Sequence, residues 1–413
     1  MASTGSKKRA IIHNLSTLNP ISQYIDLFCT QRKLIESGSL SVLNARREAA
    51  AVAFERQGFP SHKVERYKYT DVISAFAPNY GISFQHKQPE RMDYPEDVFS
   101  RYGTLADVEA DAITALNTML VQDLAVIHIP AGIHKENPIQ VMHTLRSTAP
   151  LMQNRRLLIV AEAGAHVQVL LNERADEGQD FLTTQVTEVF VGEGAHVEIY
   201  DIESTHARFH RFHQLFADVT TGGQLTHSVF TLSGGLSRNQ TDVLLTGKGA
   251  EVNLLGCAIT DGHQHVDNNT LIDHRVPDCR SRELYKYVVD QQSTGAFAGR
   301  VLVRQEAQQT DSEERNANLV CTDEARMWTQ PMLEIYADDV KCSHGSTVGQ
   351  LNDDALFYMR QRGISEPEAR TLLKQAFASE VINEIPLEAL RQRLAAMVET
   401  RFRSCEDCRL CKK

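Results

Sequence analysis

A thiol and an imidazole stand two residues apart in the last fifth of the chain, at Cys342 and His344. They lie where an apolar, strand-like pattern gives way to a helical one. If this stretch is extended, residues two apart project from the same face, so both side chains point the same way. Thiolate and imidazole are soft or borderline donors suited to iron or zinc. The alternative is a buried cysteine and a hydrogen-bonded histidine that close off a core, and a bare C-x-H spacing favours it.

A second group of thiols ends the sequence, where Cys405, Cys408 and Cys411 follow a C-x2-C-x2-C spacing. Three thiols at this spacing can bind one metal ion or an open cluster, because two intervening residues bring each pair within reach of one centre. The fourth cysteine of a ferredoxin-type run is missing. Two interpretations stay open: an accessory iron or zinc site completed by a ligand from elsewhere, or a solvated tail with adventitious metal affinity.

The other cysteines and the clustered histidines favour packing over chemistry. Cys257, Cys279 and Cys321 show no C-x-x-C spacing, and free cysteine is often a small core residue. The histidines within residues 206–213 fall in a strand-like region, where a spacing of four only puts two side chains on one face at a distance. Most of these histidines, and of those within residues 263–274, are predicted to be solvent-facing or hydrogen-bonded polar residues on strands.

Composition limits the classes of function. The formal net charge of −10 argues against a nucleic-acid-binding surface as the main activity. No apolar run approaches a membrane span, and no signal-peptide core follows the basic N-terminus. The protein is therefore predicted to be cytoplasmic, with its eight cysteines as reduced thiols or metal ligands. The sequence holds no P-loop, so ATP hydrolysis by this chain is not expected.

Three regions follow one another along the chain. Residues 1–118 are predicted to be mainly helical, with helices at Leu40 to Gln57, where Gly58 ends the pattern, and at Asp107 to Leu120. Residues 119–346 consist of short alternating strands. Residues 347–413 are predicted to form a helical domain with the cysteine-containing tail.

Glycines mark a repeat in the middle region. Residues 163–170 nearly repeat as residues 193–200, and one glycine per unit gives steps of about 26 to 32 residues, at Gly132, Gly164, Gly194, Gly223 and Gly249. A turn glycine before a short β-branched strand at such intervals is typical of stacked β units, which bury their apolar faces only against one another. The pattern alone fits a β-helix-like solenoid or a sandwich with similar strand spacing.

Helical periodicity returns after Gly349. Asn352 or Asp353 can cap a first helix, and Ser365 with Glu368 forms a capping box for a second. A third helix is predicted from Leu387 to Phe402. These helices could simply cover the end of the solenoid.

Four ordered segments carry a resemblance to a known family. Between Ala250 and Phe402 the chain resembles the SufB/SufD family, the core subunits of the Suf machinery that assembles iron–sulfur clusters, and within it the SufD branch. The likeness is densest in four segments, His265–His274, Cys279–Lys286, Leu333–Tyr336 and Ala337–Leu351. It implies a right-handed parallel β-helix (solenoid) between N-terminal and C-terminal helical domains.

The resemblance also implies a function. It suggests a non-catalytic scaffold subunit of a SufB–SufC–SufD complex, in which His344 and, with less support, Cys342 contribute to a transient iron–sulfur cluster shared with a SufB-like partner. The C-terminal helices would dock a SufC-like ATPase. Some complexes of the family are thought to bind a flavin, but this sequence shows no flavin motif. Whether the isolated chain also forms a homodimer stays open.

Two alternatives are weighed against this interpretation. A SufB-like primary scaffold would be longer and carry extra cysteines toward its N-terminus, whereas only Cys29 precedes the β region here. A carbohydrate-active β-helix enzyme could use an acid and base cluster such as Asp273 to Arg275. Such enzymes are usually secreted, which the free thiols and the absence of a signal peptide disfavour.

Overall fold

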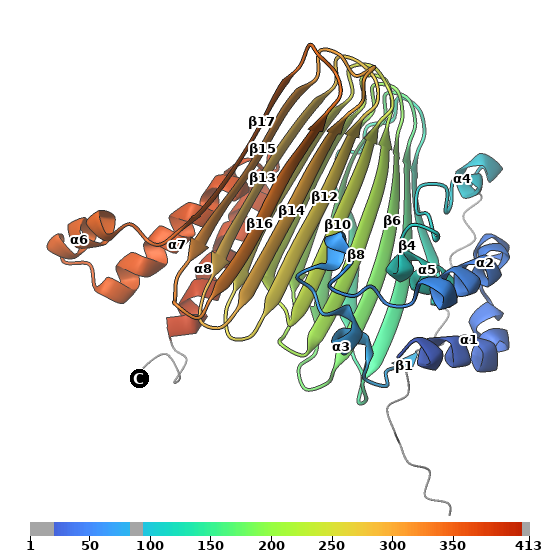
Figure 1. Ribbon diagram of the computed structural model, residues 1–413, viewed down its shortest axis with the longest axis horizontal. Helices are drawn as coiled ribbons and strands as arrows, with labels where there is room; N and C mark the ends of the chain where they lie inside the picture. The colour runs from blue at the N-terminus through green and yellow to red at the C-terminus, as the bar shows by residue number, and fades with distance from the viewer. Residues whose placement is uncertain (1–19, 83–93, 407–413) are drawn as a thin grey trace, which may run out of the picture.

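The computed structural model describes residues 20–82 and 94–406, and most of them form a parallel β-solenoid (Figure 1). From β2 onward, successive strands alternate between two facing sheets, so one turn contributes a strand to each, and all pairs are parallel. The predicted solenoid of stacked units is thereby confirmed, and the sandwich is not observed. Helices flank it toward both ends of the chain.

The two sheets have nine and eight strands. The first sheet contains β1 Gly81–Ile82, β2 Leu124–Ile129, β4 Leu151–Ala161, β6 Phe181–Val191, β8 Phe209–Val219, β10 Leu236–Leu245, β12 His265–His274, β14 Thr294–Val303 and β16 Arg326–Ile335. The second contains β3 Ile139–Leu145, β5 His166–Ala175, β7 His196–Ser204, β9 Gln224–Ser233, β11 Glu251–Thr260, β13 Arg280–Val289, β15 Asp311–Val320 and β17 Lys341–Gly349.

A column of residues with left-handed (positive φ) backbone conformation links the turns at one corner of the solenoid. Each donates its backbone N–H to a carbonyl of the following turn, as Gly164 does to Glu193 at 2.8 Å. Positive φ favours glycine at these positions. The fourth is Gly222, with φ 62°, and not the predicted Gly223. After Gly249 the column continues in Asp278 and Gln309, also at positive φ, so the glycine signal fades while the turn persists.

The interior of the solenoid is apolar along one half and polar along the other. Inward valines, leucines and isoleucines of both sheets, such as Val197, Leu215 and Val243, form the main core. In the polar half Arg211 donates to Glu173, Asp201 and Asn239 at 2.9, 2.5 and 2.6 Å. Although burial opposes ionisation, Arg211 and His213 hold the pKa of Asp201 below its usual value.

The N-terminal helices cover the first sheet near its beginning. They are α1 Pro20–Glu36, α2 Ser41–Gln57, α3 Val72–Phe76, α4 Glu96–Ser100 and α5 Ala112–Leu120, and their core includes Phe212 of the sheet. The predicted helix at residues 40–57 is confirmed as α2. The helix predicted from Asp107 begins only at Ala112, because Asp111 is its N-cap and accepts hydrogen bonds from two backbone N–H groups.

The C-terminal helices are α6 Asp353–Gln361, α7 Glu366–Asn383 and α8 Glu388–Glu406. Side chains of α7 and α8, such as Val381 and Leu394, pack on the outer face of the second sheet. The predicted caps are confirmed: Asn352 accepts from the N–H of Ala355 at 3.0 Å, and Ser365 from that of Glu368 at 3.4 Å. α6 projects away from the solenoid (Figure 1).

Across residues 20–82 and 94–406, none of the helices combines the length and the apolar character that crossing a membrane requires.

Candidate functional site

Cys342 and His344 lie on β17, the last strand of the second sheet. β17 pairs with β15 along one edge, and the sheet ends there within the described residues. One row of its backbone hydrogen-bonding groups therefore lies at the open end of the solenoid. Such an edge is a template for pairing with another chain.

The register fixes which way the two side chains point. Cys342 is paired with Ser312 and His344 with Glu314, and both partners are buried inside the solenoid. Registered neighbours in a parallel sheet project to the same side. Cys342 and His344 therefore both project toward the interior at its open end, where His344 is exposed and Cys342 half-buried.

Cys342 lies in an apolar environment. It packs against a small cluster that contains Val301, Val303 and Ala337. Burial, together with the charge of Asp311, raises the pKa of the Cys342 thiol. Less thiolate is then present at neutral pH than for an ordinary cysteine. This favours the packing role that the sequence left open for Cys342, and it leaves His344 as the more accessible donor.

Two buried carboxyl groups lie in register behind His344, on the neighbouring strands β15 and β13. Glu314 is stacked in register on Glu283 of β13, and its carboxyl group reaches across to β14, where a Cβ on Gly299 would lie 1.9 Å from Oε1. Burial and the neighbouring Glu283 raise the pKa of Glu314 to about 9. Burial raises the pKa of Glu283 to about 7. At neutral pH Glu314 is therefore a neutral acid beneath the open end.

Large apolar side chains surround this open end. Ile335, Tyr336 and Val348 are 40%, 63% and 53% exposed. The strand β16 is half-buried along most of its length, whereas its neighbour β14 is mostly buried, because no further turn follows β16. Exposed apolar groups beside an unpaired strand edge are typical of an interaction surface.

Of the other cysteines that the structure describes ahead of the tail, none lies beside another. Cys257 lies under the C-terminal helices, Cys279 in the solenoid core and Cys321 beside the helix-covered patch. Burial raises the pKa of Cys257 to about 12 and that of Cys321 to about 11, and it also raises that of Cys279. Cys29 is exposed on α1. These positions agree with the packing role expected for the three core thiols.

The cysteine tail falls at the edge of the described chain. Cys405 belongs to the last turn of α8, and Cys408 and Cys411 lie outside the described residues. The accessory metal site therefore stays a prediction.

The histidines singled out by the sequence include hydrogen-bonded residues, such as His213 and His274, and the exposed turn residue His263. His213 lies 2.5 Å from Asp201 through Nδ1, and His274 lies 2.9 Å from Ser281 through Nε2. Sequence reasoning missed two other groups, the acid pair described above and a cluster around Glu198 of β7. For the cluster around Glu198 the signal was present in the repeat, which places a histidine two residues after the turn glycine in successive units.

Comparison with known proteins identifies two matching family models. Residues 143–377 match the model described as "SUF system FeS cluster assembly, SufBD core domain". Residues 18–94 and 89–141 match the model described as "SufBD protein N-terminal region". The core match covers the solenoid from β3 onward and extends into α7.

Individual relatives agree with these matches. An iron–sulfur cluster assembly SufBD family protein of Synechocystis is 34% identical over 315 residues, which are 72% of this chain and 66% of that protein. The iron–sulfur cluster assembly protein SufD of Escherichia coli is 31% identical over 73% of this chain and 72% of its own. SufD of Bacillus subtilis is 24% identical over 88% of this chain and 82% of its own length.

Proposed function

Because this chain belongs to the SufB/SufD family of iron–sulfur cluster assembly proteins and is a SufD-like member of it, we propose that it is a non-catalytic scaffold subunit. Its partners are a SufB-like subunit and a SufC-like ATPase. The cluster is the cargo of the complex. It forms at the interface of this chain with the SufB-like subunit and then leaves.

The observation that carries the proposal is the open end of the solenoid. The edge of β17 offers unpaired backbone groups, and Ile335, Tyr336 and Val348 offer apolar area beside it. A partner that continues the sheet buries both at once. His344 then lies at the boundary between the two subunits and not in the interior of either one.

His344 supplies the ligand chemistry at this boundary. A neutral imidazole binds iron through one ring nitrogen, and it is a weaker anchor than a thiolate. A cluster that must be passed on benefits from a ligand that leaves readily. Cys342 contributes to the shape of the site. When its thiol is ionised, it also supplies a second donor.

The raised pKa of Cys342 favours the SufD-type role over that of a SufB-like primary scaffold. A primary scaffold needs a thiolate at the assembly site at neutral pH, since the thiolate is the form that binds metal. The more accessible donor on this chain is an imidazole. The principal thiolate is then expected from the partner.

The docking surface for the ATPase is assigned to the C-terminal helices. Phe357 and Tyr358 of α6 are 64% and 59% exposed, and Leu372 of α7 is exposed as well. The helix α6 itself projects away from the solenoid (Figure 1). Exposed aromatic residues on a projecting helix suit a groove on a partner.

The test combines complex formation with cluster assembly. The chain is co-purified with SufB-like and SufC-like subunits and reconstituted anaerobically, and cluster yield is read from iron content and visible absorbance. His344→Ala is expected to leave the complex intact and to weaken metal binding at the shared site by about tenfold or more, as loss of a ligand should. The matched control is His263→Ala, which removes an exposed histidine from a turn of the solenoid.

A wild-type cluster yield from the His344→Ala complex would contradict the ligand role. Failure of the wild-type chain to bind either partner would contradict the scaffold role itself.

A further inference from the structure

A cluster of three potential metal ligands lies on the outer face of the second sheet, away from β17. His166 begins β5 and His196 begins β7, and the two residues are paired directly in register. Glu198 follows His196 by two residues, so it projects from the same face of β7. Among the described residues this is the only group of three histidine, cysteine or acidic side chains whose ligand atoms all lie within 4.8 Å of one another.

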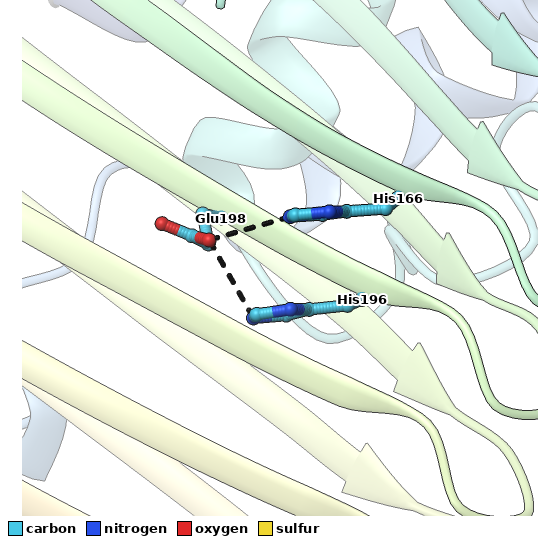
Figure 2. Close-up of side chains that lie close together, drawn as sticks. All are labelled: His166, His196 and Glu198. Atoms are coloured by element: carbon cyan, nitrogen blue, oxygen red, sulfur yellow. Dashed lines mark hydrogen bonds and ion pairs between the residues drawn. The ribbon is translucent and has the colours of Figure 1, made fainter. Parts of the chain in front are cut away.

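The two imidazoles face one oxygen of the carboxylate. Oε1 of Glu198 lies 3.4 Å from Nε2 of His166 and 3.7 Å from Nε2 of His196. Figure 2 shows the rings parallel to each other, with the carboxylate opposite their outer ends. The ring centroids are 4.7 Å apart and the planes differ by 4°. All three donor atoms therefore converge on one small volume.

These separations match those of ligands that share a metal ion. Bonds of about 2.1 Å in a tetrahedral site place neighbouring ligand atoms about 3.4 Å apart. The observed distance of 3.4 Å equals that value, 3.7 Å lies close to it, and the two histidine ligand atoms lie within 4.8 Å of each other. As hydrogen bonds the same contacts are long or absent, because N–H···O bonds usually measure 2.7–3.2 Å.

Other side chains hold the carboxylate in this orientation. Glu198 is buried, and its second oxygen, Oε2, accepts hydrogen bonds from the hydroxyl of Tyr200 and, at 3.2 Å, from Nε2 of Gln168. Oε1 is thereby left for the imidazoles. Metal-binding carboxylates are commonly fixed in this way by outer hydrogen bonds. The half-exposed histidines leave the other side of the cluster open to solvent.

We propose that His166, His196 and Glu198 together bind one divalent transition-metal ion of the zinc(II) or iron(II) class on the outer face of the solenoid. Two imidazoles and one carboxylate are a ligand set of zinc in open sites and of non-haem iron(II). The remaining coordination positions face solvent. This site is separate from the cluster-building interface on β17, and it does not depend on the function proposed for that interface.

The ion would also connect two successive turns of the solenoid. His166 belongs to β5, whereas His196 and Glu198 belong to β7. A ligand that binds the folded chain and not the unfolded one raises stability. Bound metal is therefore expected to raise the melting temperature of the wild-type chain.

The experiment uses the full chain after removal of metal by a chelator. Cobalt(II) is titrated as the probe, because its visible absorption reports tetrahedral coordination, and zinc(II) or anaerobic iron(II) is then added to displace it. The titration is repeated with Cys405→Ser, Cys408→Ser and Cys411→Ser combined. The chain with these three substitutions is expected to keep the cobalt band that arises from the histidine cluster.

Four single variants in that background test the ligands. His196→Ala and Glu198→Gln are expected to lose the band and the metal-dependent rise in melting temperature, while their metal-free melting temperatures stay close to that of the parent. Tyr200→Phe should weaken binding by about 10-fold to 100-fold, since it removes an outer hydrogen bond. His263→Ala should bind cobalt(II) like the parent.

Two results would overturn the proposal. In one, His196→Ala and the parent bind cobalt(II) equally. In the other, the band disappears when the three tail cysteines are replaced, which would assign the metal to the tail.

Discussion

The stacked carboxyl groups of Glu283 and Glu314 make stability depend on pH. Their pKa values in the folded chain, about 7 and about 9, lie above the ordinary value of 4.5. Between pH 4.5 and 9 the folded chain therefore holds protons that the unfolded chain has released. The free energy of unfolding falls as pH rises through this window. Each unit of pKa difference corresponds to about 1.4 kcal/mol.

Glu314→Gln is expected to remove much of this dependence. Glutamine keeps the volume and carries no charge, so the variant should exceed the wild type in stability at pH 9 by on the order of 2 kcal/mol, with a smaller difference at pH 5. The measurement is chemical unfolding of both proteins at the two pH values. Glu313→Gln is the matched control, because Glu313 is a half-exposed neighbour on the same strand that pairs with Arg282. An equal pH response in Glu314→Gln and wild type would contradict the argument.

At the scale of the elements, the repeat predicted the architecture because turn chemistry is local. A left-handed turn residue favours glycine wherever the chain makes that corner, and the five glycines read from the sequence, four of them in that conformation and Gly223 one residue after it, were enough to indicate stacked units. The same logic explains the limits of the signal. Asp278 and Gln309 adopt the turn without glycine, so the last turns could be placed only by the structure.

The register between strands could not be predicted from the sequence. Glu283 and Glu314 are 31 residues apart, and His166 and His196 are 30 apart, whereas other turns differ in length. Because a slip of one residue moves every side chain to the opposite face, the steps alone do not show which groups meet. Cys342 and His344 were accessible to prediction because they lie on a single strand.

The projecting helix α6 allows a test of ATPase docking. Phe357→Ser combined with Tyr358→Ser is expected to leave the melting temperature within a few degrees of wild type, because both side chains are largely exposed. Binding of a SufC-like ATPase should weaken by about 2 kcal/mol or more if these aromatic residues anchor the contact. The measurement is titration calorimetry with the purified ATPase.

Val52→Ser is the control for the loss of an exposed apolar side chain, since Val52 is 56% exposed on α2 at the other end of the chain. Unchanged ATPase binding by the α6 variant would place the docking surface elsewhere.

At the scale of the whole molecule, the two ends of the solenoid differ. Toward the N-terminus, α5 and its neighbours cover the first sheet, and their core includes Met152 and Leu182 of that sheet. Toward the C-terminus, α7 and α8 cover the outer face of the second sheet but leave β16 and β17 uncovered (Figure 1). The end at β16 and β17 is therefore free of these helices, and such an end of an elongated stack is suited to join another stack end to end.

The two terminal strands of the second sheet therefore make a paired test of the joining end. Val348 on β17 and Met142 on β3 are 53% and 49% exposed, at opposite ends of the same sheet. Val348→Lys should weaken association with a SufB-like subunit by about tenfold or more, because a lysine must be desolvated where strands meet. Met142→Lys should leave association unchanged. Sedimentation of each variant with and without the partner measures this.

If the isolated wild-type chain self-associates through β17, Val348→Lys alone should make it monomeric. The reverse ranking of the two variants would assign the interface to the β3 end.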